Sequence, residues 1–320
     1  MKLQTIIPLN SEKNQIDYQS TLFLLGSCFV QNIGRKLNYY QFQTLQNPLG
    51  ILFHPIAIEN LIIRTIEDKA YADADVFYFN ERWHCFDSHS DLSDPSKENL
   101  LSNLNSALLN TRNQLGEASH IVITLGTAWV YKDVETHKRV ANCHKLPQKQ
   151  FTKELLTESE IEVSLKRILL KLRKVNENAS VIFTISPIRH LKDGFVENQR
   201  SKANLISAIG KIMESASSDK NLYYFPAYEI MLDELRDYRF YAEDMVHPNN
   251  LAIDYIWKKF KSVWISEKAD SVMKVVQEIQ KGLAHRPFNE QAEQYQLFLK
   301  SLEEKISHLK KEYPFMNFDI

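Results

Sequence analysis

Two short stretches of the sequence contain the residue types that acyl-transfer chemistry needs. Ser27 and Cys28 directly follow an apolar run at 22–25 and one glycine. A hydroxyl or thiol can attack an ester carbonyl once a neighbouring base removes its proton. Far along the chain, Asp244 and His247 lie three positions apart. A carboxylate that orients an imidazole forms such a base, so we expect these distant segments to meet in one catalytic site.

The residues around Ser27 and Cys28 predict a strand, a tight turn and a helix. The run 22–25 is apolar throughout, which is typical of a strand buried on both faces of a parallel sheet. Beyond the turn, Val30, Ile33 and Leu37 recur at helical spacing. A side chain in this turn would lie at the carboxyl end of the sheet, beside free helix N–H groups that favour an anion.

The rest of the chain alternates between apolar runs and helical patterns. Further buried strands are predicted at 121–125, 181–185 and 222–225. This alternation predicts a three-layer α/β/α sandwich with a mainly parallel sheet, as in flavodoxin-like folds. Other expected elements are a short strand at 41–45, a hairpin within 76–86, a polar segment over 133–152, and helices that begin at Pro55 or cover 94–115, 158–175, 198–215 and 251–260.

Composition excludes several classes of protein. The 320 residues carry a net charge of −1, with 44% hydrophobic and 25% charged residues, which is ordinary for a globular chain. No basic block suggests nucleic acid, and no apolar stretch approaches the ~20 residues that span a bilayer. The start lacks the pattern of a signal peptide, so a cytoplasmic location is expected. The 3 cysteines form no CxxC pair, and no metal or cofactor is expected.

The composition changes near residue 266, where Lys, Glu and Gln become frequent. We therefore expect a main domain over 1–265 and a helical C-terminal extension over 266–320, with helices at 272–283 and 289–313. The extension either packs back on the domain or forms a homodimer contact through its helices. A partner-binding arm is the third alternative.

The motifs at both ends of this predicted site resemble those of the GSCFA family, a bacterial group usually placed in the SGNH/GDSL hydrolase superfamily. The name motif reads Gly26-Ser27-Cys28-Phe29-Val30, with Val in place of the final Ala, and Asp244-x-x-His247-Pro248 resembles the last superfamily block. Similar pieces occur at 47–55, 125–129, 142–145 and 184–190. The resemblance covers most of the first 260 residues. It implies an SGNH-hydrolase-like fold and cleavage of an ester.

The resemblance also implies an order of preference for the nucleophile. The superfamily's catalytic Ser stands two positions after a Gly, and that register falls on Cys28, while Ser27 takes the place of an Asp. A shift of the turn by one residue would present Ser27 instead. Cys28 is therefore the first candidate and Ser27 the second, with Asp244 and His247 completing the site.

An acyl-transfer site also needs N–H donors for the developing oxyanion. The backbone N–H of Cys28 and that of Gly50, in a second loop, are the expected donors. The superfamily's third block has an Asn two residues after a Gly, but here Ala128 follows Gly126 at that place. Residues that could replace this Asn or contact the substrate are Thr127, Asn47, Asn142, His144 and His190. Arg189 could bind an anionic group of the substrate.

Three functions remain open from the sequence. The first is an SGNH-like hydrolase that cleaves an acyl ester, such as an O-acyl group on a carbohydrate. The second is an O-acyltransferase that uses the same site and passes the acyl group to an alcohol in place of water. The third is a non-catalytic binding module that kept the fold, which the missing Asn favours.

Overall fold

A five-stranded parallel sheet forms the centre of the molecule. The computed structural model describes residues 4–216, 219–289 and 291–318. The sheet has the order β10-β9-β5-β1-β2, and all its pairings are parallel. Its strands are β1 (Thr21–Gly26), β2 (Gln43–Gln46), β5 (His120–Leu125), β9 (Ser180–Ile185) and β10 (Leu222–Phe225). Numbered along the chain, this is the 2-1-3-4-5 order of flavodoxin-like folds, and the predicted fold class is confirmed.

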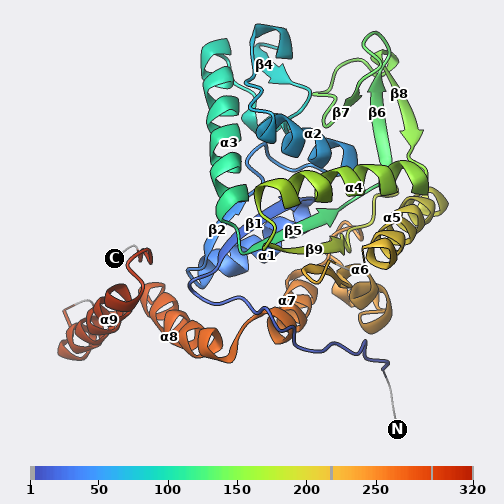
Figure 1. Ribbon diagram of the computed structural model, residues 1–320. Helices are drawn as coiled ribbons and strands as arrows, with labels where there is room; N and C mark the ends of the chain where they lie inside the picture. Colours follow the sequence, from blue (N-terminus) through green and yellow to red (C-terminus); the bar gives the residue numbers. More distant parts are fainter. Residues whose placement is uncertain (1–3, 217–218, 290, 319–320) are drawn as a thin grey trace.

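Helices cover both faces of the sheet, as Figure 1 shows. Successive residues of β1 enter different cores, because side chains alternate across a strand: Leu22 and Leu24 pack into one core, Phe23 and Leu25 into the other. Helices on the Leu22 side are α1 (Cys28–Tyr39), α7 (Asn250–Trp264) and α8 (Glu267–Leu283). Helices on the Phe23 side are α2 (Pro55–Ile66), α3 (Lys97–Glu117), α4 (Glu158–Val175) and α5 (Phe195–Ser215).

The junction between β1 and α1 depends on a glycine. Gly26 has φ +127°, and a Cβ at this position would lie 2.0 Å from the carbonyl oxygen of Thr124. Only glycine tolerates this backbone, so β1 can end in close contact with β5. Ser27 then occupies the N-cap position, and α1 begins at Cys28. The predicted strand, turn and helix are confirmed.

A smaller lobe stands beyond the carboxyl ends of the strands. It contains the predicted hairpin, β3 (Val76–Phe79) and β4 (Arg82–Cys85), and a second antiparallel sheet in the order β7-β6-β8. These strands are β6 (Trp129–Asp133), β7 (Arg139–Val140) and β8 (Phe151–Leu155). The polar segment at 133–152 therefore contains β7 and the start of β8, which the sequence analysis did not predict. The strands are short and only half buried, so no apolar run marks them.

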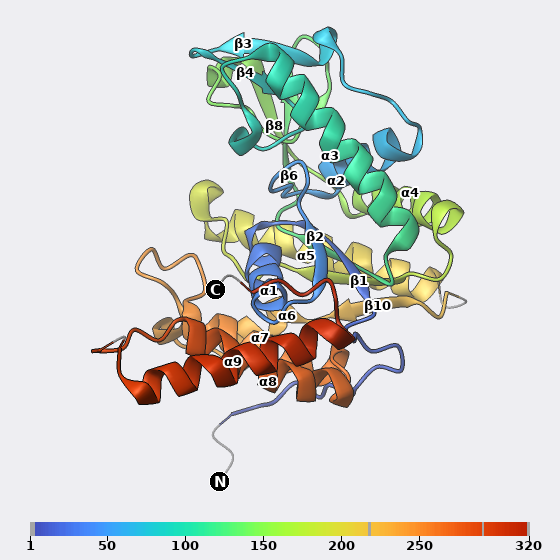
Figure 2. The ribbon, with the colours of Figure 1, turned by 90° about the vertical axis from the view of Figure 1, so that its left-hand side faces the viewer.

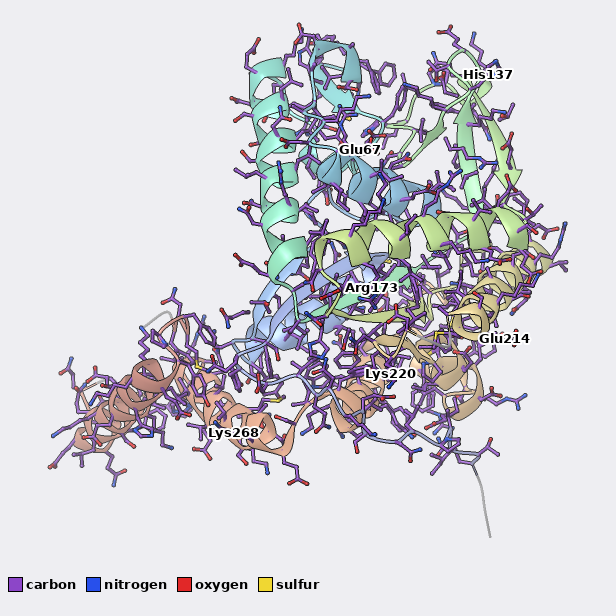
Figure 3. The ribbon with its side chains drawn as sticks, viewed as in Figure 1. Glu67, His137, Arg173, Glu214, Lys220 and Lys268 are labelled. Atoms are coloured by element: carbon purple, nitrogen blue, oxygen red, sulfur yellow. The ribbon has the colours of Figure 1, made fainter. Side chains whose placement is uncertain are left out.

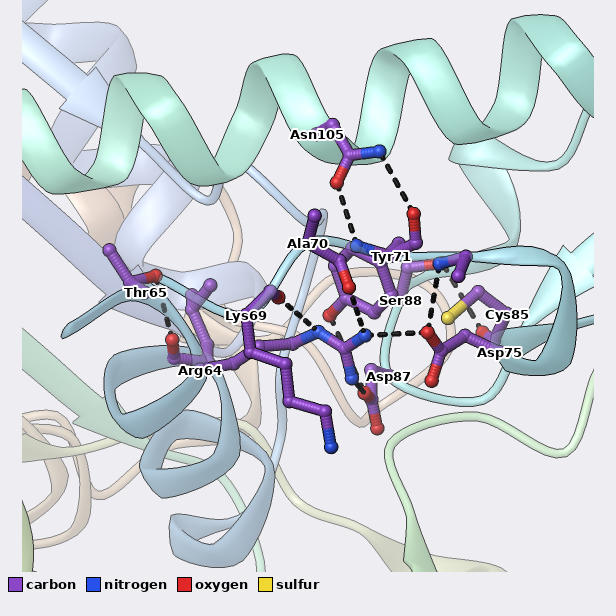
Figure 4. A network of polar contacts seen from close by, with 12 residues as sticks. Arg64, Thr65, Lys69, Ala70, Tyr71, Asp75, Cys85, Asp87, Ser88 and Asn105 are labelled. Atoms are coloured by element: carbon purple, nitrogen blue, oxygen red, sulfur yellow. Dashed lines mark hydrogen bonds and ion pairs between the residues drawn. The ribbon is translucent and has the colours of Figure 1, made fainter. Parts of the chain in front are cut away.

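A polar network joins the lobe to α2 and α3, as Figure 4 shows. Arg64 of α2 donates to Asp75 at 2.6 Å and lies 3.7 Å from the centre of the Tyr71 ring. Asp87 lies 3.7 Å from the same guanidinium. Asn105 of α3 accepts from the N–H of Tyr71 at 2.7 Å and donates to its carbonyl at 3.1 Å. Because Arg64 and Tyr71 are shared among these contacts, the lobe is held firmly on the two helices.

Short helical turns complete the connections. They are 3-10 turns at Asp73–Asp75, Ser90–Leu92, Gln148–Gln150, Leu191–Asp193 and Tyr238–Phe240, the short helix α6 (Ala227–Glu229) and a π-helical turn at Ile230–Glu234. At the other end of the sheet, Arg173 of α4 donates to Asp219 at 2.8 Å and to the carbonyl of Asn221 at 3.1 Å (Figure 3). This contact fixes the turn that leads into β10.

The C-terminal helices pack back on the domain. α8 and α9 (Glu293–Glu312) lie side by side beneath α1 and α7 in Figure 2. Ile306 and Leu309 of α9 belong to the same core as α1 and α7. Residues 4–20 form a lead-in in which Ile16 makes an isolated bridge to Ile265. Among the described helices, none has an apolar stretch long enough to cross a membrane.

Candidate active site

The turn after β1 lies at the topological switch point of the sheet. β1 and β5 are neighbours, but the chain continues from β1 to β2 on one side and from β5 to β9 on the other. In open α/β sheets, ligands bind in the crevice outside the carboxyl ends of such strands. Ser27 and Cys28 follow β1 and Gly126 follows β5, so the fold places all three at this crevice.

Ser27 and Cys28 have different surroundings. Ser27 is 0% exposed, whereas Cys28, the first residue of α1, is partly exposed. Burial raises the pKa of the Cys28 thiol, and this is opposed by the backbone N–H groups of Cys28 and Phe29 and by the Lys202 ammonium. The thiol is therefore the reachable one of the pair, and it needs a base to lose its proton at neutral pH.

Asp244 holds His247 in the orientation that a general base requires. The Oδ2 atom of Asp244 lies 2.6 Å from Nδ1 of His247. Its Oδ1 atom accepts from the N–H groups of Val246 at 2.9 Å and His247 at 3.0 Å. These backbone N–H groups, His247 first, lower the pKa of Asp244 to about 2. The ionised carboxylate thus binds Nδ1–H and leaves Nε2 of His247 able to accept a proton.

The turn that carries this pair is tied to the loop after β9. The N–H of Arg189 donates to the carbonyl of Val246 at 3.2 Å, and its guanidinium bonds to the carbonyl of Met245. The same guanidinium lies 4.2 Å from the centre of the Tyr241 ring. Arg189 therefore anchors the turn, which is a structural task and differs from the substrate contact that we considered. Within the described residues, no hydrogen bond joins His247 to Ser27 or Cys28.

His190 and Ser27 both lie close to Gly126. A Cβ on Gly126 would lie 3.2 Å from Cβ of Ser27 and 3.4 Å from Nε2 of His190. Burial, followed by the charges of Lys202 and His247, lowers the pKa of His190 to about 3. His190 is therefore neutral at physiological pH.

Polar atoms without partners gather around this crevice. In the part of the chain that the structure describes, Oγ of Ser27, Nδ2 of Asn47 and Nε2 of His190 are buried and make no hydrogen bond. Asn47 is fixed through its other side-chain atom, because Oδ1 accepts from the N–H of Gly26 at 2.8 Å. Buried polar atoms are nearly always paired in folded proteins, so a group of unpaired ones at a strand end is typical of a binding site.

The backbone donors differ from those we expected. The N–H of Gly50 donates to the carbonyl of Asn47 at 2.7 Å and closes a turn, so it does not face a substrate. The N–H groups of Gly126 and Thr127 both donate to the carbonyl of Phe53, at 2.8 and 3.1 Å. The hydroxyl of Thr127 is 3.0 Å from that of Ser201. None of these contacts involves the N–H of Cys28 at the start of α1, which is the other backbone donor that we expected.

Asn142 and His144 are not brought to the crevice. Oδ1 of Asn142 accepts from the N–H of His144 at 2.8 Å. Nε2 of His144 donates to the carbonyl of Cys85 at 2.7 Å, and Nδ1 lies 3.3 Å from the hydroxyl of Ser90. Burial lowers the pKa of His144 to about 4. The segment after β7 folds over the β3–β4 hairpin, so the contacts of these residues stabilise the lobe.

The sequence analysis missed three polar residues of α5 that hold the site loops. Oδ1 of Asn198 accepts from the N–H of His190 at 2.9 Å, and the hydroxyl of Ser201 accepts from the N–H of Ala128 at 2.7 Å. Lys202 donates to the carbonyls of Gly126 and Ser186, both at 2.7 Å. All three α5 residues are buried. Their spacing places them on the apolar face of α5, and polar residues at these positions were the available signal.

Two surface cavities lie beside the lobe and beside the turn of His247, and Cys28 lines neither of them. A cavity of about 680 Å³ between α2 and the lobe is lined by Arg64, Asp75, Lys138 and Arg139 among others, and by none of the proposed catalytic residues. A smaller one of about 220 Å³ is lined by Arg189, Tyr238 and Tyr241 and adjoins the turn of His247. Within the described residues, no group of three or more His, Cys, Asp or Glu side chains is arranged to hold a metal ion.

The chain belongs to the GSCFA family. The model of that family matches residues 21–260, which include the sheet, the lobe and both halves of the crevice. A second model, described as the C-terminal domain of GSCFA domain proteins, matches residues 276–319, which cover the C-terminal part of α8 and the whole of α9. A search of curated proteins finds no match to this sequence.

Several solved structures are similar to this chain at low identity. An acetyl esterase variant with an acetate ion shares 8% identity at a TM-score of 0.36, over 81% of this chain and 99% of that one. An acetyl xylan esterase from Butyrivibrio proteoclasticus shares 13% identity at 0.35, over 83% and 65%. A family two carbohydrate esterase from Clostridium thermocellum, in complex with cellohexaose, shares 9% identity at 0.36, over 84% and 66%. Because these scores are low, the function is inferred from the residues of this chain.

Proposed function

We propose that this protein is an SGNH-like hydrolase that cleaves an acyl ester, with Cys28 as nucleophile, His247 as base and Asp244 as the group that orients His247. The observation that carries the proposal is the Asp244–His247 contact of 2.6 Å, held by a turn that bonds to the loop after β9. In this proposal Nε2 of His247 faces the switch point of the sheet, where Cys28 begins α1. A carboxylate, an imidazole and a nucleophile in this order perform acyl transfer on several unrelated folds.

In the first half of the reaction, Nε2 of His247 takes the thiol proton and the sulfur of Cys28 attacks the ester carbonyl carbon. The oxyanion that forms would accept from the N–H of Cys28. The unpaired Nδ2 of Asn47 and Nε2 of neutral His190 are the side-chain donors that would replace the missing Asn. When the intermediate collapses, the alcohol leaves with the proton held by His247, and the acyl group stays on Cys28 as a thioester.

In the second half, a water molecule attacks the thioester while His247 takes one of its protons. The carboxylic acid leaves, and the sulfur of Cys28 recovers the proton from His247. His247 must come within hydrogen-bond distance of Cys28 for both steps. Such hydrogen bonds are often long in a free enzyme and shorten when substrate binds. The half-exposed turn of Asp244 and His247 leaves room for that approach.

The substrate class that we propose is an alcohol ester with a small acyl group, and an O-acyl carbohydrate is the first natural class to test. The test uses purified protein with p-nitrophenyl acetate, and compares His247→Ala with His308→Ala. His308 is an exposed residue of α9 and serves as the matched control. We expect a loss of about 100-fold in kcat/KM for His247→Ala, as removal of a general base usually gives, and no change for the control. Equal rates in both variants would reject the proposal.

A non-catalytic binding module is the second candidate, and one observation favours it. The N–H groups of Gly126 and Thr127 are both occupied by the carbonyl of Phe53, at the place where an esterase would present donors. Mass spectrometry after incubation with an activated ester separates the two functions. An acyl group on Cys28 supports the enzyme, and its absence supports the module. Faster release of that acyl group by an added sugar would point to an acyltransferase.

A further inference from the structure

Lys202 is a cation enclosed within the protein, directly under the proposed site. It is 1% exposed and lies on α5 among the residues that face the sheet. A buried ammonium is costly unless hydrogen bonds and charges compensate it, so Lys is almost never fully buried without a partner. No carboxylate lies within ion-pair distance of it in the described part of the chain. Packing alone therefore does not explain why a lysine is buried at this position.

The contacts of Lys202 connect it to both sides of the crevice. Its ammonium donates to the carbonyl of Gly126 after β5 and to that of Ser186 after β9, each at 2.7 Å. It also lies 5.4 Å from the centre of the Tyr228 ring. Ser27 and His190 both lie close to Gly126. The position of the ammonium is thus fixed relative to the turn that carries Cys28.

The protonation of Lys202 affects the pKa values of Cys28 and His190. Burial lowers the pKa of Lys202 to about 7, while Cys28 and then Glu229 oppose this shift. The charge of Lys202 in turn lowers the pKa values of Cys28 and His190. Below about pH 7 the ammonium is therefore charged and favours a negative sulfur at Cys28. Above that pH it is neutral and the effect disappears.

We propose that Lys202 is a positioning residue of this site, which ties the ends of β5 and β9 together and, when charged, stabilises the thiolate of Cys28. This inference deepens the proposed function and rests on it for the role of Cys28. The sequence alone does not single out Lys202, because a lysine in an amphipathic helix is normally a solvent-exposed residue.

The test measures alkylation of Cys28 by iodoacetamide between pH 6 and pH 9 in the full-length protein, with mass spectrometry to quantify each cysteine. Wild type is compared with Lys202→Met, Lys202→Arg and the control Lys211→Met. Lys211 is on the same helix but is exposed and pairs with Glu158 at 3.0 Å. We expect Lys202→Met to react about tenfold more slowly than wild type at pH 6, and about equally at pH 9. Lys202→Arg keeps its charge and should react faster than wild type at pH 9.

A purely structural role would give a rate ratio that does not change with pH, and that result would overturn the proposal. Absence of alkylation at Cys28 in wild type would also overturn it. Cys85 is buried, so its alkylation would show that a variant has unfolded. If Lys202→Met unfolds, Lys202→Gln is measured in its place. Unfolding of both variants would show that Lys202 acts in stability alone and would overturn the proposal. The alkylation experiment uses no ester, so its outcome is independent of the hydrolase assay. If the protein cleaves no ester but the ratio of alkylation rates still changes with pH, the hydrolase proposal is rejected and the role of Lys202 is retained.

Discussion

Ser27 and Cys28 are adjacent in the chain, yet the turn between β1 and α1 places them in different surroundings. Ser27 is fully buried at the N-cap position, and its hydroxyl makes no hydrogen bond among the described residues. Cys28 is partly exposed at the N-terminus of α1. A nucleophile must reach its substrate, so at the scale of single residues the structure favours Cys28 in the proposed reaction.

Replacement of each residue by alanine should separate their roles. Ser27→Ala should leave the free energy of unfolding within about 1 kcal/mol of wild type, because the hydroxyl loses no hydrogen bond, and should keep ester cleavage. Cys28→Ala should lose the cleavage. Urea unfolding and the p-nitrophenyl acetate assay measure both effects. Loss of activity in a well-folded Ser27→Ala protein would transfer the nucleophile to Ser27.

At the scale of elements, the site depends on how closely β1 approaches β5 before α1 begins. Gly26 permits this approach, since any side chain there would collide with the carbonyl of Thr124. The same crevice is closed from the other side by Asn198, Ser201 and Lys202 in the first turns of α5. Two helices that are far apart in sequence therefore position the same loops.

Gly26→Ala should destabilise the protein by about 2 kcal/mol or more, because it combines a disfavoured φ with a backbone collision. The matched control is Gly210→Ala in α5, where a Cβ would meet nothing within 4 Å. That substitution should be neutral or stabilising by up to about 1 kcal/mol, as alanine favours helices. Urea midpoints measure both variants. A Gly26→Ala protein as stable as wild type would show that the strand end can move.

The strands that could be predicted are those whose burial requires a run of apolar residues in the sequence. The strands at 22–25, 121–125 and 181–185 are buried on both faces, so each is a mainly apolar run. The sheet β7-β6-β8 lacks such runs because its strands are half exposed. The residues of α5 that hold the site were missed for a related reason: their hydrogen bonds join segments that only the fold brings together.

At the scale of the whole molecule, α8 and α9 share a core with α1 and α7, so the C-terminal extension packs back on the sheet domain. Of the alternatives we considered, packing on the domain is the one observed. A dimer contact through these helices and a domain boundary at residue 265 stay predictions.

Buried neutral histidines should make the whole molecule sensitive to acid. Burial lowers the pKa values of His54 and His144 from 6.5 to about 4 and that of His190 to about 3. Below pH 6.5 the unfolded chain binds protons that the folded chain does not, so stability is full above that pH and falls toward pH 4. Each histidine should contribute about 1.4 kcal/mol per pH unit in this range.

Urea unfolding at pH 7 and pH 5 measures this dependence. His54 offers a specific variant, because its Nδ1 accepts from the N–H of Ala57 at the start of α2 and loses that bond when protonated. His54→Asn keeps an N-cap acceptor that does not titrate, so the loss of stability between the two pH values should be smaller. The same loss as in wild type would show that His54 does not contribute to the acid sensitivity.

The sequence by itself determined the parallel α/β/α fold, because apolar runs are local properties. It also predicted that the turn of Ser27 and Cys28 pairs with Asp244 and His247, and this stays a prediction, since no hydrogen bond joins the two segments within the described residues. Only the tertiary structure decided which of Ser27 and Cys28 is exposed, that the N–H groups of Gly50, Gly126 and Thr127 are already bonded, and that Lys202 lies beneath the site. Burial and hydrogen-bond partners depend on segments that are distant in the chain. They cannot be specified until the sheet has brought those segments together.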